Sequence, residues 1–255
     1  MFTTKDDLKL SYGVDLTIGE AFVNRAVPHD NLYWKKRTIY IPGAPGYYFM
    51  PIFTDMLYRC GADRNLLLSD DQFQLNELIL HHAAMLEMEQ CSWLKQAAEV
   101  IRLTAPRVKN KLLFDELKPY LLQDRPLALP DNRWGTSYPS LNRADTYLLT
   151  LVTLGGEDFN LDLAIEGWYA LMTYFLILDD LADIHQDLKQ DEDNVIRDAG
   201  ITEQGIARIQ DMINKSREVM DKINPVMANR IDYRNSLINL PEIFKSIGYA
   251  SPSER

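Results

Sequence analysis

Apolar residues recur at helical spacing along most of the chain after residue 47. The clearest example begins at Ser69 or Asp70, either of which can act as an N-cap, and apolar side chains then return every three or four positions as far as Trp93. No alternating strand pattern of comparable length competes with this periodicity. The sequence therefore predicts an all-α protein, with helices over about 48–62, 70–102, 107–123, 141–154, 161–189 and 202–223.

Helix-breaking residues mark two irregular segments. Prolines and glycines crowd into Pro42–Gly46, and little periodicity precedes them, so we expect residues 1–47 to form an irregular N-terminal arm. Residues 123–140, which read QDRPLALPDNRWGTSYPS, form the best candidate for a rim or lid segment. Pro225 is expected to end the last predicted helix.

The helix predicted over 161–189 has an unusually apolar middle. It lacks a polar face between Trp168 and Leu178, so it should run through the centre of a helical bundle. Its polar residues begin abruptly at Asp179. A helical chain of 255 residues commonly has one continuous core, and we therefore expect residues 1–255 to form a single domain.

Charge and composition narrow the possible partners. The formal charge is −10, and the sequence has no dense cluster of Lys and Arg that could neutralise the phosphates of a polynucleotide, so nucleic-acid binding is not expected. The apolar run from Trp168 to Leu178 is too short to span a bilayer, and the N-terminus lacks a signal-peptide pattern. With Cys60 and Cys91 as reduced thiols, the sequence indicates a cytoplasmic protein without an integral membrane segment.

Acidic side chains follow the apolar segment at helical spacing. Asp179, Asp183 and Asp187 are four residues apart and would share a helix face, with Asp180 beside them. Crowded carboxylates repel one another, and their burial is costly unless they are paired or bind a metal. Mg²⁺ takes one or two carboxylates and completes its coordination with water and phosphate oxygens, so the pattern indicates a magnesium site. The alternative interpretation is an acidic surface where a buried helix emerges into solvent.

The context of this acidic segment resembles a known family. The stretch from Gly155 to Asp183 ends in YFLILDDLAD and is similar to the late helices of trans-isoprenyl diphosphate synthases, where a small-residue turn precedes a helix ending like F-Q-I-x-D-D-I-L-D. The earlier segment from Glu77 to Leu86, ELILHHAAML, is similar to that family's E-L-I-H-x-A-S-L segment. The resemblance covers about residues 70–190 and implies the class I isoprenoid-synthase fold, an antiparallel helix bundle around a central cavity. It also implies a prenyl diphosphate substrate, a cluster of up to three Mg²⁺ ions and a homodimer.

One motif of the family is altered in this chain. Where the family carries its first D-D-x-x-D motif, the chain reads Met88–Ser92, MEQCS, and Glu89 is the remaining candidate ligand there. The late motif is also similar to the N/D-D-x-x-S/T-x-x-x-E pattern of class I terpene cyclases, with Asp179 and Asp187 at its two ends. With one motif altered, the resemblance favours cyclisation or hydrolytic quenching of the prenyl cation over chain elongation.

The resemblance also implies roles for individual residues. The catalytic aspartates would be Asp179, Asp180 and Asp183. The Mg²⁺ ligands would be Asp179, Asp183, Asp187 and Glu89. The diphosphate would be contacted by basic side chains before and after the late motif, namely Arg133, Arg143, Arg230 and Arg234. The prenyl chain would lie against apolar side chains, namely Met85, Trp168, Met172 and Phe175. The alternatives are surface charges for the arginines and core packing for the apolar residues.

Three functional hypotheses remain open from the sequence. The first is a Mg²⁺-dependent terpene cyclase or prenyltransferase that ionises an allylic diphosphate. The second is a catalytically silent homologue that binds a prenyl diphosphate, or that regulates an active synthase by forming a heterodimer with it. The third is an unrelated helical binding protein in which the acidic cluster is incidental. Turnover by the isolated protein would separate the first hypothesis from the second.

Overall fold

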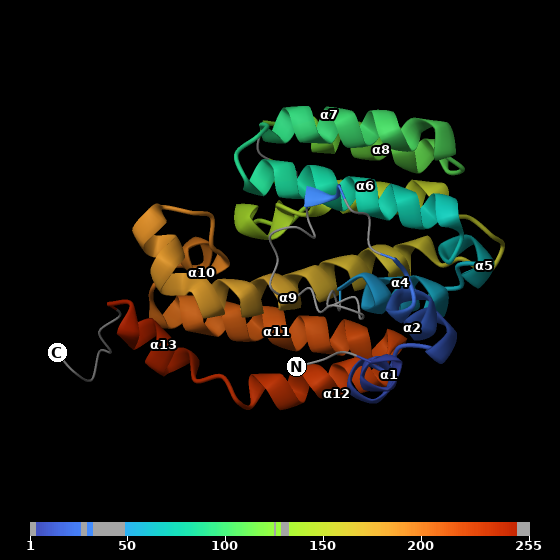
Figure 1. Ribbon diagram of the computed structural model, residues 1–255. Coiled ribbons are helices and arrows are strands. Elements are labelled where there is room, and N and C mark those ends of the chain that lie inside the picture. Colours follow the sequence, from blue (N-terminus) through green and yellow to red (C-terminus); the bar gives the residue numbers. More distant parts are fainter. Residues whose placement is uncertain (1–3, 27–29, 33–48, 125, 129–132, 249–255) are drawn as a thin grey trace. The chain divides into compact units, whose positions relative to one another are not determined.

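A computed structural model describes residues 4–26, 30–32, 49–124, 126–128 and 133–248. Within these ranges all regular structure is helical and no β-strand occurs, which confirms the predicted all-α class (Figure 1). Contacts between residues divide the chain into two compact units, the first comprising Met1–Pro126 with Ala144–Ile165 and the second Leu127–Arg143 with Glu166–Arg255. The single-domain organisation and the isoprenoid-synthase type of bundle stay predictions.

The first unit is built from short and medium-length helices. Its α-helices are α1 (Lys5–Tyr12), α2 (Leu16–Val23), α4 (Phe49–Arg59), α5 (Arg64–Leu67), α6 (Asp70–Glu87), α7 (Trp93–Thr104) and α8 (Lys111–Leu121). Its 3₁₀-helices are η1 (Ala105–Arg107) and η3 (Asp145–Thr153), and the first turn of α9 (Leu161–Gln190) also belongs to it. Helices α4 and α8 match the sequence prediction in type and approximate position.

Two of these helices lie within the predicted irregular arm. Helix α1 begins with a capping box, in which Thr4 Oγ1 accepts from the Asp7 N–H and the Asp7 carboxylate accepts from the Thr4 N–H, each at 3.1 Å. Asp15 caps α2 by accepting from the N–H of Thr17 at 2.9 Å. The prediction was therefore wrong for residues 5–23, because side-chain caps rather than a long periodic pattern define these eight-residue helices. Residues 33–47 of the arm lie outside the described residues.

The single helix predicted over 70–102 is instead a helical hairpin. Helix α6 ends at Glu87, Ser92 caps the start of α7, and the two helices pack side by side (Figure 1). Glu89 lies in the turn between them with a φ of 55°, in the left-handed region that side-chain-bearing residues adopt rarely. The candidate ligand Glu89 is therefore in a turn and not on a helix face.

A long 3₁₀-helix lies in the interior of the first unit. The nine residues of η3 are all buried, in the region where the sequence predicts an α-helix over 141–154. Polar side chains from three helices bond to it: Gln96 donates to Thr146 at 3.1 Å, Tyr120 donates to Asp145 at 2.5 Å, and Gln72 accepts from Thr153 at 2.9 Å. Runs of this length are uncommon for 3₁₀ geometry, and these contacts from α6, α7 and α8 stabilise the segment.

The second unit contains most of α9 and the helices that follow it. It also contains η2 (Pro139–Asn142), which precedes α9 in the chain. The helices after α9 are α10 (Val195–Ala199), α11 (Glu203–Ile223), α12 (Pro225–Asn235) and α13 (Leu240–Ser246). The extents of α9 and α11 agree with the predicted 161–189 and 202–223. Pro225 does not end the helical part of the chain, because a proline is compatible with the first position of a helix and Pro225 begins α12.

Helices α11 and α12 are joined by one residue. Asn224 is the C-cap of α11, and it is also the N-cap of α12, where its side chain accepts from the N–H of Met227 at 3.2 Å. The two helices run side by side in opposite directions (Figure 1). Their apolar residues, including Ile213, Met220, Met227 and Ile231, are buried in the second unit. The amphipathic pattern of this region therefore forms a helical hairpin.

Helix α9 is long and apolar enough to cross a membrane by length and composition. It has 30 residues, and its most apolar window has a mean hydropathy of 1.4. Of that window, 56% is buried inside the protein, and Trp168, Leu171 and Ile177 have no exposed surface. A buried core helix has the same composition, so α9 is only weak evidence for a membrane segment.

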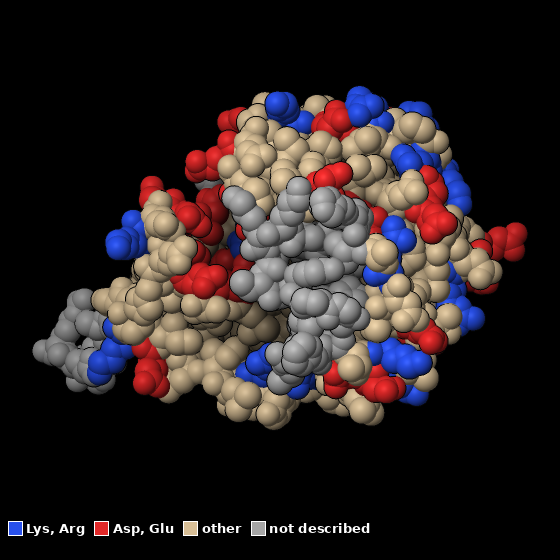
Figure 2. All heavy atoms as spheres, viewed as in Figure 1, with Lys and Arg blue, Asp and Glu red and all other residues tan. Residues whose placement is uncertain are grey.

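Charged side chains of both signs are interspersed on the face drawn in Figure 2. Elsewhere in the described helices, charged residues one turn apart form pairs, such as Arg102 with Glu99, Lys111 with Asp115, and Lys215 with Asp211. Exposed pairs of this kind contribute little to stability, but they mix the surface charges locally. The expected absence of nucleic-acid binding stays a prediction.

The environment of the two cysteines leads to a first prediction. Both are free thiols; Cys60 follows α4 and is 2% exposed, whereas Cys91 is half-buried in the α6–α7 turn. Burial raises the pKa of the Cys60 thiol to about 12, so at pH 8 only about one molecule in 10⁴ would carry the reactive thiolate. We expect a thiol reagent at pH 8 to label one cysteine per folded chain and two in concentrated urea.

Single variants assign the labelled cysteine. Cys60→Ala should retain the rapidly labelled thiol, and Cys91→Ser should lose it. Rapid labelling of both thiols in the folded protein would contradict the packing described around α4.

Candidate functional site

The four aspartates near the end of α9 occupy two different faces of that helix. Asp179 and Asp183 are exposed, whereas Asp180 and Asp187 are buried. The expected row of Asp179, Asp183 and Asp187 therefore needs correction. Each step of four residues leaves a side chain about 40° further around the helix, so Asp187, eight residues after Asp179, lies about 80° around the axis from it. Asp187 is seven residues after Asp180, and a step of seven residues brings it to within about 20° of the direction of Asp180.

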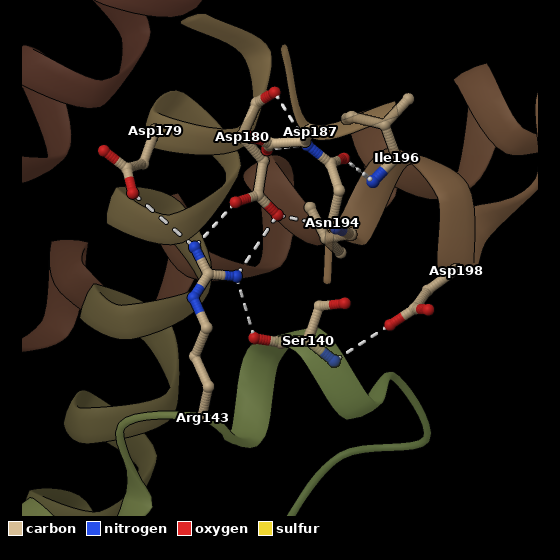
Figure 3. A network of polar contacts seen from close by, with 9 residues as sticks. Ser140, Arg143, Asp179, Asp180, Asp187, Asn194, Ile196 and Asp198 are labelled. Carbon is tan, nitrogen blue, oxygen red and sulfur yellow. Dashed lines mark hydrogen bonds and ion pairs between the residues drawn. The ribbon is translucent and has the colours of Figure 1, made fainter. Parts of the chain in front are cut away.

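Asp180 forms a buried ion pair with Arg143, which follows η2. The Arg143 Nη2 is 2.6 Å from Asp180 Oδ1, and its Nη1 donates to Ser140 O at 3.0 Å and to Asp180 Oδ2 at 3.4 Å (Figure 3). The N–H of Val195, at the start of α10, also donates to Asp180 Oδ2 at 2.6 Å. The exposed fractions of the Asp180 and Arg143 side chains are 2% and 29%. Asp180 thus connects α9 to η2 and α10.

Burial and charge act in opposite directions on this pair. Burial raises the pKa of the Asp180 carboxyl above its ordinary value, and the hydrogen bonds and charge of Arg143 and the Val195 N–H oppose that rise. Burial would lower the pKa of Arg143, but the hydrogen bond to Asp180 and the charges of Asp180 and Asp179 outweigh it, so the pKa of Arg143 is raised. Arg143 is therefore a fixed positive charge beside the aspartates.

Asn194 occupies the space beside Asp187. Its Nδ2 donates to Asp187 Oδ2 at 2.7 Å and to the backbone oxygen of Asp180 at 3.0 Å, and its Oδ1 accepts from the Ile196 N–H at 2.9 Å (Figure 3). In addition, the N–H of Ser140 donates to Asp198 at 2.9 Å. These contacts attach α10 to α9 and to η2, and they place Asp187 in a hydrogen-bonded interior.

The exposed aspartates are a suitable donor set for Mg²⁺. Asp179 is 67% exposed and its carboxylate lies 3.6 Å from Arg143 Nη2, while Asp183 stands one turn further along α9. Among the described residues, no three His, Cys, Asp or Glu side chains are gathered as a ready metal site. Mg²⁺ commonly needs only one or two protein carboxylates, with water and phosphate oxygens as its other ligands. The carboxylates of Asp179 and Asp183 are therefore compatible with a Mg²⁺ ion.

The four candidate arginines lie in different surroundings. Arg143 contacts the α9 aspartates, as described above. Arg133 is exposed with its guanidinium 4.8 Å from the centre of the Trp134 ring. Arg230 is half-buried on α12 with its guanidinium 5.4 Å from the Tyr233 ring centre, and Arg234 on the same helix is exposed. Arg143 is thus the predicted arginine for which the structure describes an ion pair with a candidate metal ligand, Asp179.

The predicted apolar lining is divided between the two units. Trp168 and Met172 are buried in α9 and Phe175 is half-buried, whereas Met85 is a half-buried residue of α6 in the first unit. A cavity of about 700 Å³ opens in the second unit between α11 and the α12–α13 connection, and residues such as Ile206, Gln210 and Leu237 line it. None of the residues expected to contact the prenyl chain lines this cavity.

Glu89 and the adjacent His81 and His82 belong to the first unit. Glu89 is exposed in the α6–α7 turn. His81 Nδ1 accepts from the N–H of Leu32 at 3.0 Å, and the His81 and His82 rings are nearly perpendicular, with centres 5.4 Å apart. His81 is therefore hydrogen-bonded to the backbone, and its ring is not aligned with that of His82 as a pair of metal ligands would be.

Three residues of this network, Asn194, Val195 and Asp198, were not predicted from the sequence. A signal for Asn194 was present, because an asparagine directly after the polar stretch Asp191–Asp193 and before Val195 and Ile196 is a typical N-cap position. The contacts of its Nδ2 with α9 had no such signal, since they depend on how α10 packs.

Comparisons with known proteins identify no relative. No family model matches the chain, and neither the curated proteins nor the solved structures include a match. The likeness to isoprenoid synthases therefore rests on the residues of this chain alone.

The buried pair leads to a prediction about stability. Arg143→Met leaves Asp180 buried with the Val195 N–H as its remaining described donor, and removal of one partner from a buried pair typically costs about 3–5 kcal/mol. Because Arg143 is 29% exposed, we expect the lower end, about 3 kcal/mol, in urea unfolding followed by circular dichroism.

Arg197→Met is the matched control in the same unit. Arg197 pairs with Asp191, whose side chain is 95% exposed, and loss of an exposed pair typically costs less than about 1 kcal/mol. The double variant Arg143→Met with Asp180→Asn should recover part of the loss. Equal destabilisation by the two single arginine variants would contradict a special role for Arg143.

Proposed function

We propose that this protein is a Mg²⁺-dependent class I isoprenoid enzyme that ionises the allylic diphosphate of a prenyl substrate. The observation that carries the proposal is the position of Arg143, whose Nη2 lies 3.6 Å from the Asp179 carboxylate, with Asp183 one turn further along α9. The resemblance of the segment from Gly155 to Asp183 to isoprenyl diphosphate synthases gives this arrangement its chemical interpretation.

The aspartates divide into two roles under this proposal. Asp179 and Asp183 would hold Mg²⁺ through carboxylate oxygens, and bound Mg²⁺ would stabilise negative charge on the leaving pyrophosphate. Asp180 and Asp187 would orient the end of α9, because Asp180 is paired with Arg143 and Asp187 accepts from Asn194. Two carboxylates are sufficient for an ion that also coordinates water and substrate phosphate.

Arg143 would bind the diphosphate beside the metal. Its side chain is 29% exposed while the guanidinium is paired with Asp180, so N–H groups would be shared with an incoming phosphate oxygen. Its nearest distance to Asp179 is 3.6 Å, which places a fixed positive charge next to a proposed metal ligand. This charge would strengthen the attraction for a substrate anion in an acidic protein.

The reaction after ionisation is proposed to be cyclisation or capture by water. The site of the altered first motif lies in the turn between α6 and α7, and Glu89 is not on a helix face there. Buried apolar residues of α9, such as Trp168 and Met172, would exclude water from part of the prenyl chain. A homodimer in the cytoplasm is part of the same proposal and follows from the resemblance and the composition.

The position of Glu89 also favours one competing function. A chain with a single carboxylate-bearing helix could bind a prenyl diphosphate without turning it over and regulate an active synthase in a heterodimer. Co-purification of the native protein with a second, fully equipped synthase, together with no turnover by the isolated chain, would favour this alternative.

Catalysis gives the main test of the proposal. We expect the purified protein with Mg²⁺ to release pyrophosphate from at least one of the C10, C15 and C20 prenyl diphosphates. Asp179→Asn and Asp183→Asn each remove a proposed ligand charge and should lower the rate by at least about 100-fold. Pyrophosphate release is measured by a coupled phosphate assay.

Glu166→Gln is the matched control for these variants. Glu166 is an exposed carboxylate on the same helix, about 20 Å from Asp179 along its axis. It undergoes the same change of charge and should retain the wild-type rate. No release by the wild-type protein from any of the three substrates would remove the enzymatic proposal.

A further inference from the structure

Asn194 is fully buried, and each polar atom of its side chain has a described partner. Both N–H groups of its amide are used, one toward Asp187 Oδ2 at 2.7 Å and one toward the backbone oxygen of Asp180 at 3.0 Å. Its oxygen accepts from the Ile196 N–H at 2.9 Å. A side chain that donates twice and accepts once at this reach has to be an amide, because a carboxylate cannot donate and a hydroxyl donates once.

The contacts of Asn194 are directed at the part of α9 that carries the exposed aspartates. Asp180, whose backbone oxygen it binds, directly follows Asp179, and Asp187 lies four residues after Asp183. The adjacent Val195 N–H holds the Asp180 carboxylate from the same side. Residues 194 and 195 therefore fix both the backbone and the buried carboxylates of α9 around Asp179 and Asp183.

A metal site on α9 would be sensitive to small rotations of the helix. A carboxylate stands about 5–6 Å from the helix axis, so a rotation of about 20° would displace it by about 2 Å. Metal–ligand distances tolerate deviations of only about 0.2 Å. Interactions that prevent such rotation therefore affect metal affinity even when they do not touch the metal.

We propose that Asn194 is a positioning residue, which fixes the rotation of α9 so that Asp179 and Asp183 are presented together to a divalent cation. This inference rests on the proposed function, because the metal site that Asn194 would position is the one formed by Asp179 and Asp183 in that proposal. If Asn194 has this role, removal of its amide N–H groups weakens cation binding even under conditions in which the protein remains fully folded.

Direct binding of Mn²⁺ to the full chain tests this inference without reliance on turnover. Mn²⁺ accepts the same carboxylate and water ligands as Mg²⁺, and its free concentration is measured by electron paramagnetic resonance. Asn194→Ser retains a side-chain oxygen that can cap α10 but removes the amide N–H groups. We expect its Mn²⁺ affinity to fall at least about tenfold, the lower end of the effect typical of residues that orient metal ligands.

Asn224→Ser provides the matched control. Asn224 is 2% exposed and caps α12 in the same unit, so the substitution removes the same amide from an equally buried N-cap. Its Mn²⁺ affinity should remain within about twofold of wild type, and all measurements are made well below both unfolding temperatures. Asp179→Asn, which removes a proposed ligand, should abolish binding and thereby identify the site.

The possible results separate the two proposals. Wild-type affinity in Asn194→Ser would overturn the positioning role and leave the proposed enzyme intact. If Asn194→Ser and Asn224→Ser weakened Mn²⁺ binding equally, the cause would be a general loss of rigidity in the second unit, and the positioning role would also be overturned. No Mn²⁺ binding by the wild-type chain, or binding that Asp179→Asn leaves unchanged, would remove the proposed metal site and the positioning role with it.

Discussion

The second unit depends on the buried ion pair between Arg143 and Asp180. Burying two charges is costly, and the cost is offset only where each charge has close partners, as here with Ser140 O for the arginine and the Val195 N–H for the aspartate. These partners come from segments that are distant in the sequence, so the pair selects one packing of η2, α9 and α10. The same interaction determines which aspartates remain accessible, since the face of Asp180 is occupied and that of Asp179 and Asp183 is not.

Buried polar contacts have a comparable role in the first unit. The interior segment η3 receives hydrogen-bonding side chains from α6, α7 and α8, through Gln72, Gln96 and Tyr120. Asp55, which has no exposed surface, accepts from the backbone N–H of Asp15 at 2.8 Å and pairs with Arg59 at 2.6 Å. An alternative packing of these helices would leave such groups unpaired in an apolar interior, which costs more than the hydrogen bonds themselves contribute. Polar contacts thus specify arrangements that apolar burial alone would leave open.

The limits of sequence-based prediction in this chain follow from the range of the interactions involved. Helices α9 and α11 were predicted with nearly correct bounds because their periodicity extends over many turns, whereas the short α1 and α2 are defined by local caps. The break at Glu89 was missed, since apolar residues continue at compatible spacing on both sides of the turn. For the site, the aspartates had both a metal-site and an acidic-surface interpretation; Asp179 and Asp183 are exposed, as the second interpretation predicts, and the metal site stays a prediction. The burial of Asp187 against Asn194 could not be predicted, because it depends on the packing of α10 onto α9.

The junction at Asn224 has a consequence for how this protein can change during evolution. One residue serves both α11 and α12, so the junction has no spare loop in which the chain could lengthen or shorten. A residue inserted before Met227 within the first turn of α12 would turn the rest of that helix by about 100° and carry Met227 and Ile231 away from the core. We therefore expect changes in chain length to be tolerated better in exposed turns, such as the one at Gly155 and Gly156, than at this junction.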